Sequence, residues 1–409
     1  MSEDPAILLP VELFVLLVAV ATAVALIARR AALPYSVALV LAGLALAFLV
    51  PVRGVEVTPE LILAVLLPGL VFEAAYKIDA LELRRIFNIV AVLAAPGVLL
   101  TAGIVAVVVH LVTGLDPALA FVLGAIISAT DPVAVVTLFK RLGVPARLAT
   151  TVEAESLLND GTGVVLFAIA IGAVTSPIDP GQAMVSFVAT VVFSTLIGLA
   201  AGAVVRWLMG RVDDPLLIVM LSVVAAYGTY LVADRFHESG IIATVVVGIM
   251  IGSGRRLAPM TEEARHALDI VWEFVAFLLT ALVFLLVGLA ISPDLLVATV
   301  PVIATAFVAI TIARAIVIYG LIGAGERLLP GASLIPVSYL HVMFWSGLRG
   351  AVAVALALAL PTDIPQRDLL TGAVYGVVLV TLLVQGTTAA WVVRHSGVPT
   401  GQPEEPVAP

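Results

Sequence analysis

Long apolar runs, separated by short polar or charged connections, extend along almost the whole chain. An α-helix needs about 20 apolar residues to cross a bilayer, and thirteen runs are of roughly that length. They lie at approximately 7–28, 34–50, 59–76, 87–112, 118–139, 149–174, 182–206, 215–233, 239–253, 267–291, 297–323, 333–360 and 369–393. The pattern therefore predicts an all-α polytopic membrane protein with about 13 transmembrane helices.

Composition supports this class of protein. Hydrophobic residues make up 62% of the 409 residues and charged residues only 12%, with a mean hydropathy of +1.21. Soluble domains are about one quarter charged. The acidic N-terminus MSEDP lacks a basic n-region, so we expect the first apolar run to be a retained helix rather than a cleaved signal. Disulfides and thiolate metal sites are excluded because the chain has no cysteine.

The cations between the predicted helices are distributed unequally over the two sides of the membrane. Fifteen fall on one side: Arg29, Arg30, Lys77, Arg84, Arg85, Lys140, Arg141, Arg147, Arg206, Arg211, Arg255, Arg256, Arg265, Arg327 and Arg394. Three fall on the other: Arg53, Arg235 and Arg367. Since cytoplasmic loops carry the excess of Lys and Arg, we predict an external N-terminus and a cytoplasmic C-terminus in the cell membrane.

A polar patch interrupts the sixth apolar run, in the stretch 150–165. It contains Glu155, Ser156, Asn159 and Asp160 among small and apolar residues. Residues four apart lie on the same face of a helix, so Ser156 and Asp160 share one face, and Glu155 and Asn159 share another. Ionisable residues inside a membrane are costly and mark an ion or substrate pathway. The patch must therefore face protein or water.

The fifth apolar run contains the sequence Ser128-Ala129-Thr130-Asp131-Pro132. Proline has no amide hydrogen and disfavours helical geometry at the residue before it, so we predict a helix break. Free helix ends at mid-membrane form the ion sites of transporters. Thr130 offers a hydroxyl and a carbonyl to a cation. Asp131 either contributes to that site or only caps the second half-helix.

The twelfth apolar run is interrupted in the same way by Gly347-Leu348-Arg349-Gly350. Interrupted helices at corresponding positions of two halves indicate inverted repeats. We therefore divide a transmembrane domain, 1–395, into a repeat at about 7–174, a linker helix at about 182–206 and a second repeat at about 215–393. Residues 396–409 are expected to form a short disordered cytoplasmic tail. Arg349 needs an anionic partner, for which Glu155 is the candidate.

Two further charged residues lie within apolar runs. Glu73 is near the inner end of the third run, where it either reaches the interface or holds Asn159 by a hydrogen bond. Arg314 lies deep enough in the eleventh run to need a partner, which the sequence does not identify. Phosphate-binding loops, nucleotide motifs and clustered metal ligands are all missing from the sequence. We therefore expect neither an enzyme nor an ATP-driven pump, and no cofactor or nucleic-acid partner.

Several motifs together resemble a known family. These motifs are SATDPVAV, ESLLNDGTG, LVFEAAYK, HESG, WEFVAFLLTALVFLLVGL and GLRGAVAVALAL. They are similar to the NhaP/NHE-type sodium/proton antiporters of the monovalent cation/proton antiporter superfamily. The resemblance implies thirteen helices, two crossed broken helices, a homodimer and elevator-like alternating access. The sequence departs from the family at Thr280, where asparagine is frequent.

The resemblance also implies roles for individual residues. The family's ion ligands correspond to Thr130, Ser156 and Asp160, which would bind Na⁺, while Asp131 contributes a backbone oxygen or compensates a helix dipole. Asn159 would orient the site.

By the same resemblance, Glu155 and Arg349 would form an ion pair that supports the site.

The chemistry expected of Asp160 is competition between a proton and a cation. Burial disfavours the charged form of a carboxylate, whereas a bound cation favours it. Competition at a site that is open to one side at a time is antiport. Because Asn159 stands where electrogenic relatives carry a second aspartate, the resemblance suggests electroneutral exchange of Na⁺ or Li⁺ for H⁺.

Three alternatives remain open at this stage. A K⁺/H⁺ antiporter of the same fold is the nearest, because the size of the cavity cannot be read from sequence. A cation channel would also carry intramembrane acids, although paired breaks suit a closed site better. An intramembrane aspartyl protease would need Asp131 and Asp160 to face each other as a catalytic pair.

Overall fold

The structure is a computed structural model that describes residues 5–28, 34–49, 58–175, 179–253, 260–324 and 335–401. The described residues form α-helices and short π-helical segments, the latter labelled η, with no strand among them. The first half contains α1 (Pro5–Ala28), α2 (Tyr35–Leu49), η1 (Leu61–Leu66), α3 (Leu67–Lys77), α4 (Ala80–Val92), η2 (Leu93–Gly97), α5 (Val98–Thr113), α6 (Pro117–Ser128), α7 (Val133–Leu142) and α8 (Ala146–Thr175). Next come α9 (Pro180–Met209), α10 (Pro215–Val223), η3 (Val224–Gly228), α11 (Thr229–Arg235), α12 (Gly240–Ser253) and α13 (Glu262–Ala290). The chain ends with α14 (Pro293–Ala315), η5 (Ile316–Ala324), α16 (Val337–Trp345), α17 (Ala351–Leu358), α18 (Arg367–Thr381), η6 (Leu382–Gly386) and α19 (Thr387–His395).

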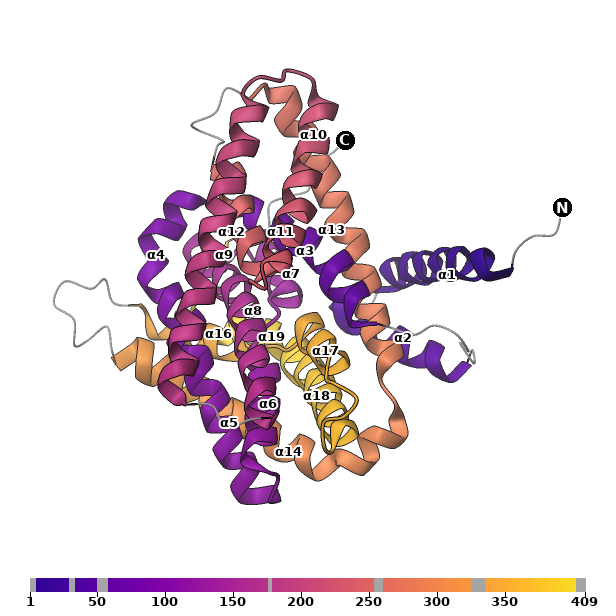
Figure 1. Ribbon diagram of the computed structural model, residues 1–409, viewed down its shortest axis with the longest axis vertical. Helices are drawn as coiled ribbons and strands as arrows, with labels where there is room; N and C mark the ends of the chain where they lie inside the picture. Colours follow the sequence, from indigo (N-terminus) through magenta and orange to yellow (C-terminus); the bar gives the residue numbers. More distant parts are fainter. Residues whose placement is uncertain are drawn as a thin grey trace.

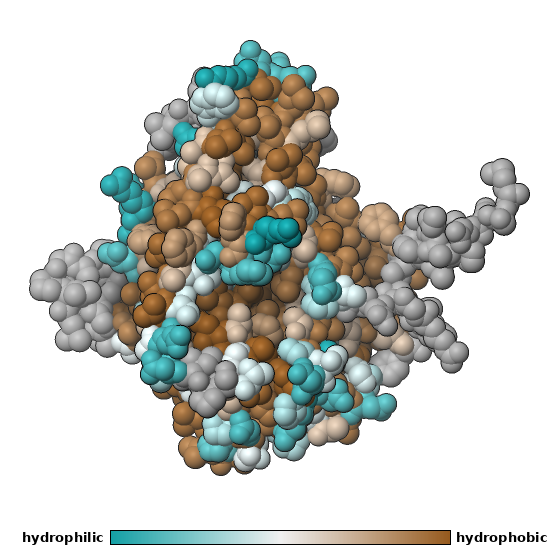
Figure 2. All heavy atoms as spheres, in the orientation of Figure 1, coloured by the Kyte–Doolittle hydropathy of each residue, from teal (hydrophilic) through white to brown (hydrophobic). Residues whose placement is uncertain are grey.

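The all-helical membrane class is confirmed. Within the described ranges, eight helices are long and apolar enough to cross a membrane, and three shorter apolar helices accompany them. Figure 1 shows α8, α17 and α19 in the middle of the molecule, while α1 extends away to one side. Apolar residues cover most of the face in Figure 2, and hydrophilic residues gather at its two ends and in patches between them. The count of thirteen spans stays a prediction, because several predicted segments are shorter than a full span.

Local sequence signals explain where several helices begin. Asp116, Asp179 and Asp214 each precede a proline, and each side chain accepts hydrogen bonds from backbone amides of the helix that follows. An aspartate N-cap followed by proline at the first helical position satisfies amides that would otherwise lack partners. At the other end, Gly114 and Gly143 terminate α5 and α7 with φ of 72° and 63°.

Small residues bring helices into close contact. Where α2 crosses α13, a Cβ added to Gly43 would lie 2.2 Å from the carbonyl oxygen of Leu285, and one added to Gly288 would lie 2.2 Å from that of Val40. Apolar side chains gain little by leaving lipid for protein, so close backbone approach is a main source of attraction between membrane helices. Both helices also line the cavity of the candidate ion-binding site.

Both predicted helix breaks are present and they contact each other. The fifth span ends as α6 at Ser128 and resumes as α7 at Val133, and the twelfth ends as α16 at Trp345 and resumes as α17 at Ala351. The backbone N–H of Asp131, in the first break, donates to the carbonyl oxygen of Leu348, in the second, at 2.8 Å. The two irregular segments thus meet in the interior, beside α8.

Some predictions concern residues that the structure does not describe. The loop cations Arg29, Arg30, Arg53, Arg255, Arg256 and Arg327, and tail residues 402–409, lie outside the described residues. The described part of the tail reaches Gly401, whose N–H donates to the carbonyl oxygen of Gly143 at 3.1 Å. The sidedness of the termini and the repeat boundaries stay predictions.

The crossing of α2 and α13 gives a first testable prediction. Gly288→Ala should lower the thermal unfolding midpoint in detergent, because overpacking against backbone typically costs about 1–3 kcal/mol. The matched control is Gly103→Ala in α5, where an added Cβ meets nothing within 4 Å. That control should be unchanged or slightly stabilised, since alanine favours the helix by up to about 1 kcal/mol over glycine. Equal midpoints for the two variants would contradict the close packing.

Candidate ion-binding site

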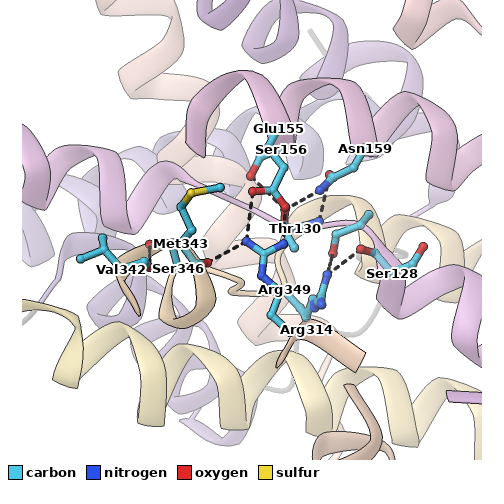
Figure 3. A network of polar contacts seen from close by, with 11 residues as sticks. Ser128, Thr130, Glu155, Ser156, Asn159, Arg314, Val342, Met343, Ser346 and Arg349 are labelled. Carbon is cyan, nitrogen blue, oxygen red and sulfur yellow. Dashed lines mark hydrogen bonds and ion pairs between the residues drawn. The ribbon is translucent and has the colours of Figure 1, made fainter. Parts of the chain in front are cut away.

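A buried hydrogen-bond network joins the first break to α8. The Asn159 side chain donates from Nδ2 to the Thr130 hydroxyl at 2.6 Å, and its Oδ1 accepts the Thr130 backbone N–H at 3.1 Å. The Thr130 hydroxyl also shares a hydrogen bond of 2.9 Å with the Ser156 hydroxyl. All three residues are 2% exposed. Asn159 therefore fixes both the main chain and the side chain of Thr130 (Figure 3).

Asp160 follows Asn159 in α8 but has different surroundings. It is half-buried, whereas Asn159 is fully buried. Among the residues that the structure describes, no hydrogen bond or ion pair reaches the Asp160 carboxylate. The break packs closely beside it, because a Cβ on Gly163 would lie 3.2 Å from the Cβ of Ala129. An uncommitted carboxylate thus lies next to the break.

Asp131 connects the amide ends of two half-helices. Its carboxylate accepts the N–H of Val133, the first residue of α7, at 3.0 Å. The carboxylate also lies at the start of α17, where the backbone N–H of Ala351 interacts favourably with its negative charge. A side chain at Gly350 would collide with this carboxylate, since its Cβ would lie 1.9 Å from Oδ2 of Asp131. A carboxylate at helix N-termini is stabilised by the amide ends, so Asp131 is a shared cap.

Arg349 binds backbone carbonyls, contrary to the predicted ion pair with Glu155. Its Nη1 donates to the carbonyl oxygens of Ser128 and Ala129, at 2.6 and 2.7 Å. These are the carbonyls that the end of α6 leaves without helical partners. Arg349 is 2% exposed. Its positive charge therefore neutralises the carbonyl end of the first broken helix.

The partner of Glu155 is Arg314, for which the sequence identified no partner. The two side chains form a two-pronged ion pair, with Nη2 of Arg314 at 3.0 Å from Oε2 of Glu155 and a second contact between Nη1 and Oε1. The same Nη2 donates to the carbonyl oxygen of Met343 at 2.8 Å, near the end of α16 (Figure 3). Arg314 thus binds a carbonyl near the end of α16, as Arg349 binds the carbonyls at the end of α6. The predicted pairing of Glu155 with Arg349 is wrong, because Glu155 pairs with Arg314.

Glu73 does not hold Asn159 in this structure. Its carboxylate forms an ion pair with Lys77, one turn further along α3. The hydrogen bonds of the Asn159 side chain go to Thr130 instead. Glu73 lies in the wall of a cavity, and its position relative to the membrane interface stays a prediction.

The cavity has a volume of about 1000 Å³ and leads towards the first break. Residues of α1, α2, α3, α7, α8, α13, η6 and α19 line it. Pro132 and Val133, beside Asp131, line it, and so do Lys77, Lys140 and Arg394 from the cation-rich connections. The cavity therefore extends from the break to the connections that carry Lys77, Lys140 and Arg394.

Sequence reasoning missed two functions of arginine. Arg314 was visible as a charge within an apolar run, but its contacts were not. Arg367 was counted only as a loop cation, yet its side chain donates to the carbonyl oxygens of Leu360 and Leu358 at the end of α17. The sequence could have indicated this role, because Arg367 follows closely after the end of a predicted helix, where backbone carbonyls lack helical partners.

The fold and the site define a class of protein: a polytopic membrane transporter with its candidate ion site at two broken helices. Within the described ranges, no group of three or more His, Asp or Glu residues is placed to hold a metal ion. The candidate cation ligands are instead one carboxylate with hydroxyl and carbonyl oxygens.

Comparisons with known proteins agree with this class. The family profile described as "Sodium/hydrogen exchanger, transmembrane" matches residues 15–395. The Na⁺/H⁺ antiporter ApNhaP of Aphanothece halophytica is 38% identical over 400 residues, covering 95% of this chain and 75% of the relative. The low-affinity Na⁺/H⁺ antiporter NhaS1 of Synechocystis sp. is 34% identical over 411 residues, covering 98% and 78%. The chain belongs to the sodium/hydrogen exchanger family.

A solved structure shares the fold. The sodium proton antiporter MjNhaP1 from Methanocaldococcus jannaschii, determined at pH 8, has a TM-score of 0.79 with this chain at 19% sequence identity. The match covers 96% of this chain and 99% of the other. The predicted NhaP-type fold is thereby confirmed.

The ion pair of Glu155 and Arg314 gives a second prediction. Glu155→Gln or Arg314→Gln should each lower the unfolding midpoint in detergent, because removing one partner of a buried pair costs about 3–5 kcal/mol. The double variant should lose less than the sum, since neither charge is then stranded. The matched cycle uses Glu155→Gln with Arg349→Gln and should show weaker coupling. Stronger coupling to Arg349 would contradict the assignment.

Proposed function

We propose that this protein exchanges Na⁺, or Li⁺, for H⁺ across the cell membrane, with both ions competing for Asp160. The observation that carries the proposal is the uncommitted, half-buried carboxylate of Asp160 beside a helix break whose other charges are matched. Membership of the sodium/hydrogen exchanger family and the printed names of the relatives support the choice of ions.

The charges around the breaks balance without Asp160. Each helix end carries about half an elementary charge, positive at the amide end and negative at the carbonyl end. Two amide ends and two carbonyl ends meet here, so their sum is close to zero. Arg349 and Arg314 contribute two positive charges, and Asp131 and Glu155 contribute two negative charges, so these four cancel in number. Asp160 is left with one negative charge, which one Na⁺ or one proton would neutralise.

This balance supports electroneutral exchange. If the site crosses the membrane interior only when it is neutral, it crosses with one Na⁺ or with one H⁺, since a net charge in that environment is costly. Each cycle then moves one ion of each kind in opposite directions. No separate coupling device is required.

We assign the Na⁺ ligands to the uncommitted carboxylate and to two hydroxyls of the neighbouring hydrogen-bond network. These are Asp160 itself and the hydroxyls of Thr130 and Ser156, which are held 2.9 Å apart. Asp131 contributes through the helix ends that it caps, and Asn159 positions Thr130. Broken helices supply such oxygen ligands in other transporters.

Alternating access would move one group of helices against another. Residues of α2, α3 and α13 and residues of α7 and α19 line the same cavity, and we propose an elevator-like motion of the second group against the first. We further propose a homodimer with the N-terminus outside and the C-terminus in the cytoplasm, so that the cavity opens to the cytoplasm.

The assignment of Asp160 gives a third prediction. Asp160→Asn should reduce Na⁺-dependent proton flux in proteoliposomes to background, because an amide can neither release a proton nor balance a cation. The matched control, Asp363→Asn, changes the same residue type at an exposed position and should transport normally. Assays with Li⁺ and K⁺ in place of Na⁺ test the alternative: flux with K⁺ alone would favour a K⁺/H⁺ antiporter. Retained Na⁺-dependent flux in Asp160→Asn would refute the proposal.

The proposed competition gives a fourth prediction. Lowering the pH should raise the apparent KM for Na⁺, by up to about tenfold per pH unit when each ion displaces one proton. Maximal rate at saturating Na⁺ should be independent of a membrane potential set with valinomycin. A rate that changes steeply with potential would exclude one-for-one exchange, and a KM that is constant with pH would exclude a shared site.

A further inference from the structure

The second half of the first broken helix, α7, has little packing of its own. Most of its residues line the cavity, and only Val135, Val136 and Phe139 are buried. By contrast, α17, the second half of the other broken helix, is buried at every residue except Leu358. Because few side chains of α7 are packed, the position of this helix depends strongly on the contacts at its two ends.

Both ends of α7 are held by contacts with distant parts of the chain. At the break, the Asp131 side chain caps the helix, and its backbone N–H donates to the carbonyl oxygen of Leu348. At the other end, the helix stops at Gly143, whose φ of 63° lies in the left-handed region. The carbonyl oxygen of Gly143 accepts a hydrogen bond of 3.1 Å from the backbone N–H of Gly401. A segment near the C-terminus therefore contacts this end of α7.

The contact between the two glycines leaves no room for a side chain. A Cβ added to Gly143 would lie 3.1 Å from the backbone nitrogen of Gly401 and 3.2 Å from its Cα. These are main-chain atoms, which cannot rotate away as the end of a flexible side chain can. Gly114 ends α5 with a similar φ of 72°, yet a Cβ added there would meet nothing within 4 Å. Gly143 is thus required both by its φ and by the close approach of Gly401.

Residues 396–401, which we call the C-terminal segment, turn back from the end of α19. The Ser396 hydroxyl donates to the carbonyl oxygen of Val393 at 2.8 Å and accepts the backbone N–H of Val398 at 3.3 Å. Gly397 lies between them with a φ of 80°. The Val398 side chain is 6% exposed and belongs to the main hydrophobic core. A local turn and one buried side chain therefore fix the course of the segment.

The C-terminal segment joins two helices that line the same cavity. It begins at the end of α19, which contributes Thr387 and Arg394 to the lining, and it reaches the end of α7, which contributes Lys140. The two helices also contact each other directly. In the proposed elevator-like motion α7 and α19 belong to the same group. A segment bound to the ends of both helices would keep those ends together while the group moves.

We propose that the C-terminal segment is a brace that fixes the end of α7 to α19, so that the two helices move together during ion exchange. The inference rests on the proposed function, because it concerns the movement of the helix that follows the ion site. Gly143 and Val398 are positioning residues, since they act on the break through α7. The brace stays closed throughout the transport cycle, which distinguishes it from a latch that must open.

A reversible cross-link tests whether the brace stays closed. The chain has no cysteine, so an introduced pair has no competing thiols. Gly143→Cys with Gly401→Cys places the two side chains within the range of a disulfide, since a Cβ on Gly143 would lie 3.2 Å from the Cα of Gly401. The oxidised protein should exchange Na⁺ for H⁺ at the same maximal rate as the reduced protein, which has the same substitutions. Loss of exchange on oxidation would reveal a latch and overturn the brace, and so would a folded protein that forms no disulfide.

A weakened brace tests whether transport needs it. Val398→Ala should lower the maximal rate per folded protein by about fivefold to tenfold, because two buried methyl groups that dock the segment are lost. The KM for Na⁺ should stay unchanged, since no ion ligand is altered. The matched control Val112→Ala removes the same groups from a position in α5 that is 67% exposed and should keep the wild-type rate. Oxidation of Val398→Ala combined with the two cysteines should restore the rate, because the disulfide replaces the lost contact.

A second pair of variants needs no disulfide. Gly143→Ala and Gly114→Ala both place alanine in the left-handed region, but only the first also presses on the C-terminal segment. Only Gly143→Ala should therefore lower the maximal rate of exchange. This pair decides the question even if Val398→Ala does not fold.

The outcomes separate the brace from the proposed function. A wild-type protein without Na⁺/H⁺ exchange would overturn the proposed function, and the role of the brace in transport with it. Wild-type exchange together with an unchanged maximal rate in Val398→Ala, or equal rates in the two glycine variants, would overturn the brace alone. A changed KM for Na⁺ at an unchanged maximal rate would place the effect on ion binding and also overturn it.

Discussion

The structure depends on neutralising helix ends inside an apolar interior. Two helices stop and restart where water is scarce, and each stop leaves polar backbone groups without partners. Arg349 contacts the carbonyl end of α6 and Arg314 that of α16, while Asp131 caps both α7 and α17. These three side chains offset the cost of leaving the backbone groups at the breaks without helical partners in the interior.

Glu155 has a place in this arrangement that differs from that of Asp160. Both are acids in the same helix, but Glu155 is 1% exposed and held by both nitrogens of the Arg314 fork. A carboxylate in such a two-pronged pair cannot readily exchange its partner. Asp160 has no such partner among the described residues. The first acid therefore maintains the frame, and the second is free to take part in exchange.

The breaks were predictable from sequence because their causes are local. Pro132 and the glycines around Arg349 act on the residues next to them. The pairing of charges was not predictable in this way. Glu155 and Arg314 are 159 positions apart, and Arg349 lies 221 positions from Ser128. Which arginine meets which partner depends on how distant helices pack, and for this reason the sequence led to Arg349 rather than Arg314 as the partner of Glu155.

The geometry of α8 explains why an asparagine and an aspartate stand next to each other. Consecutive residues of an α-helix point about 100° apart, so they cannot serve the same surface. Asn159 points to the break and offers both a donor and an acceptor, which Thr130 uses fully. An aspartate in its place would offer acceptors only, and the hydrogen bond to the Thr130 hydroxyl would need that hydroxyl as donor. The amide therefore suits the position that fixes Thr130, and the carboxylate suits the neighbouring position, where the proposed exchange requires a charge to be gained and lost.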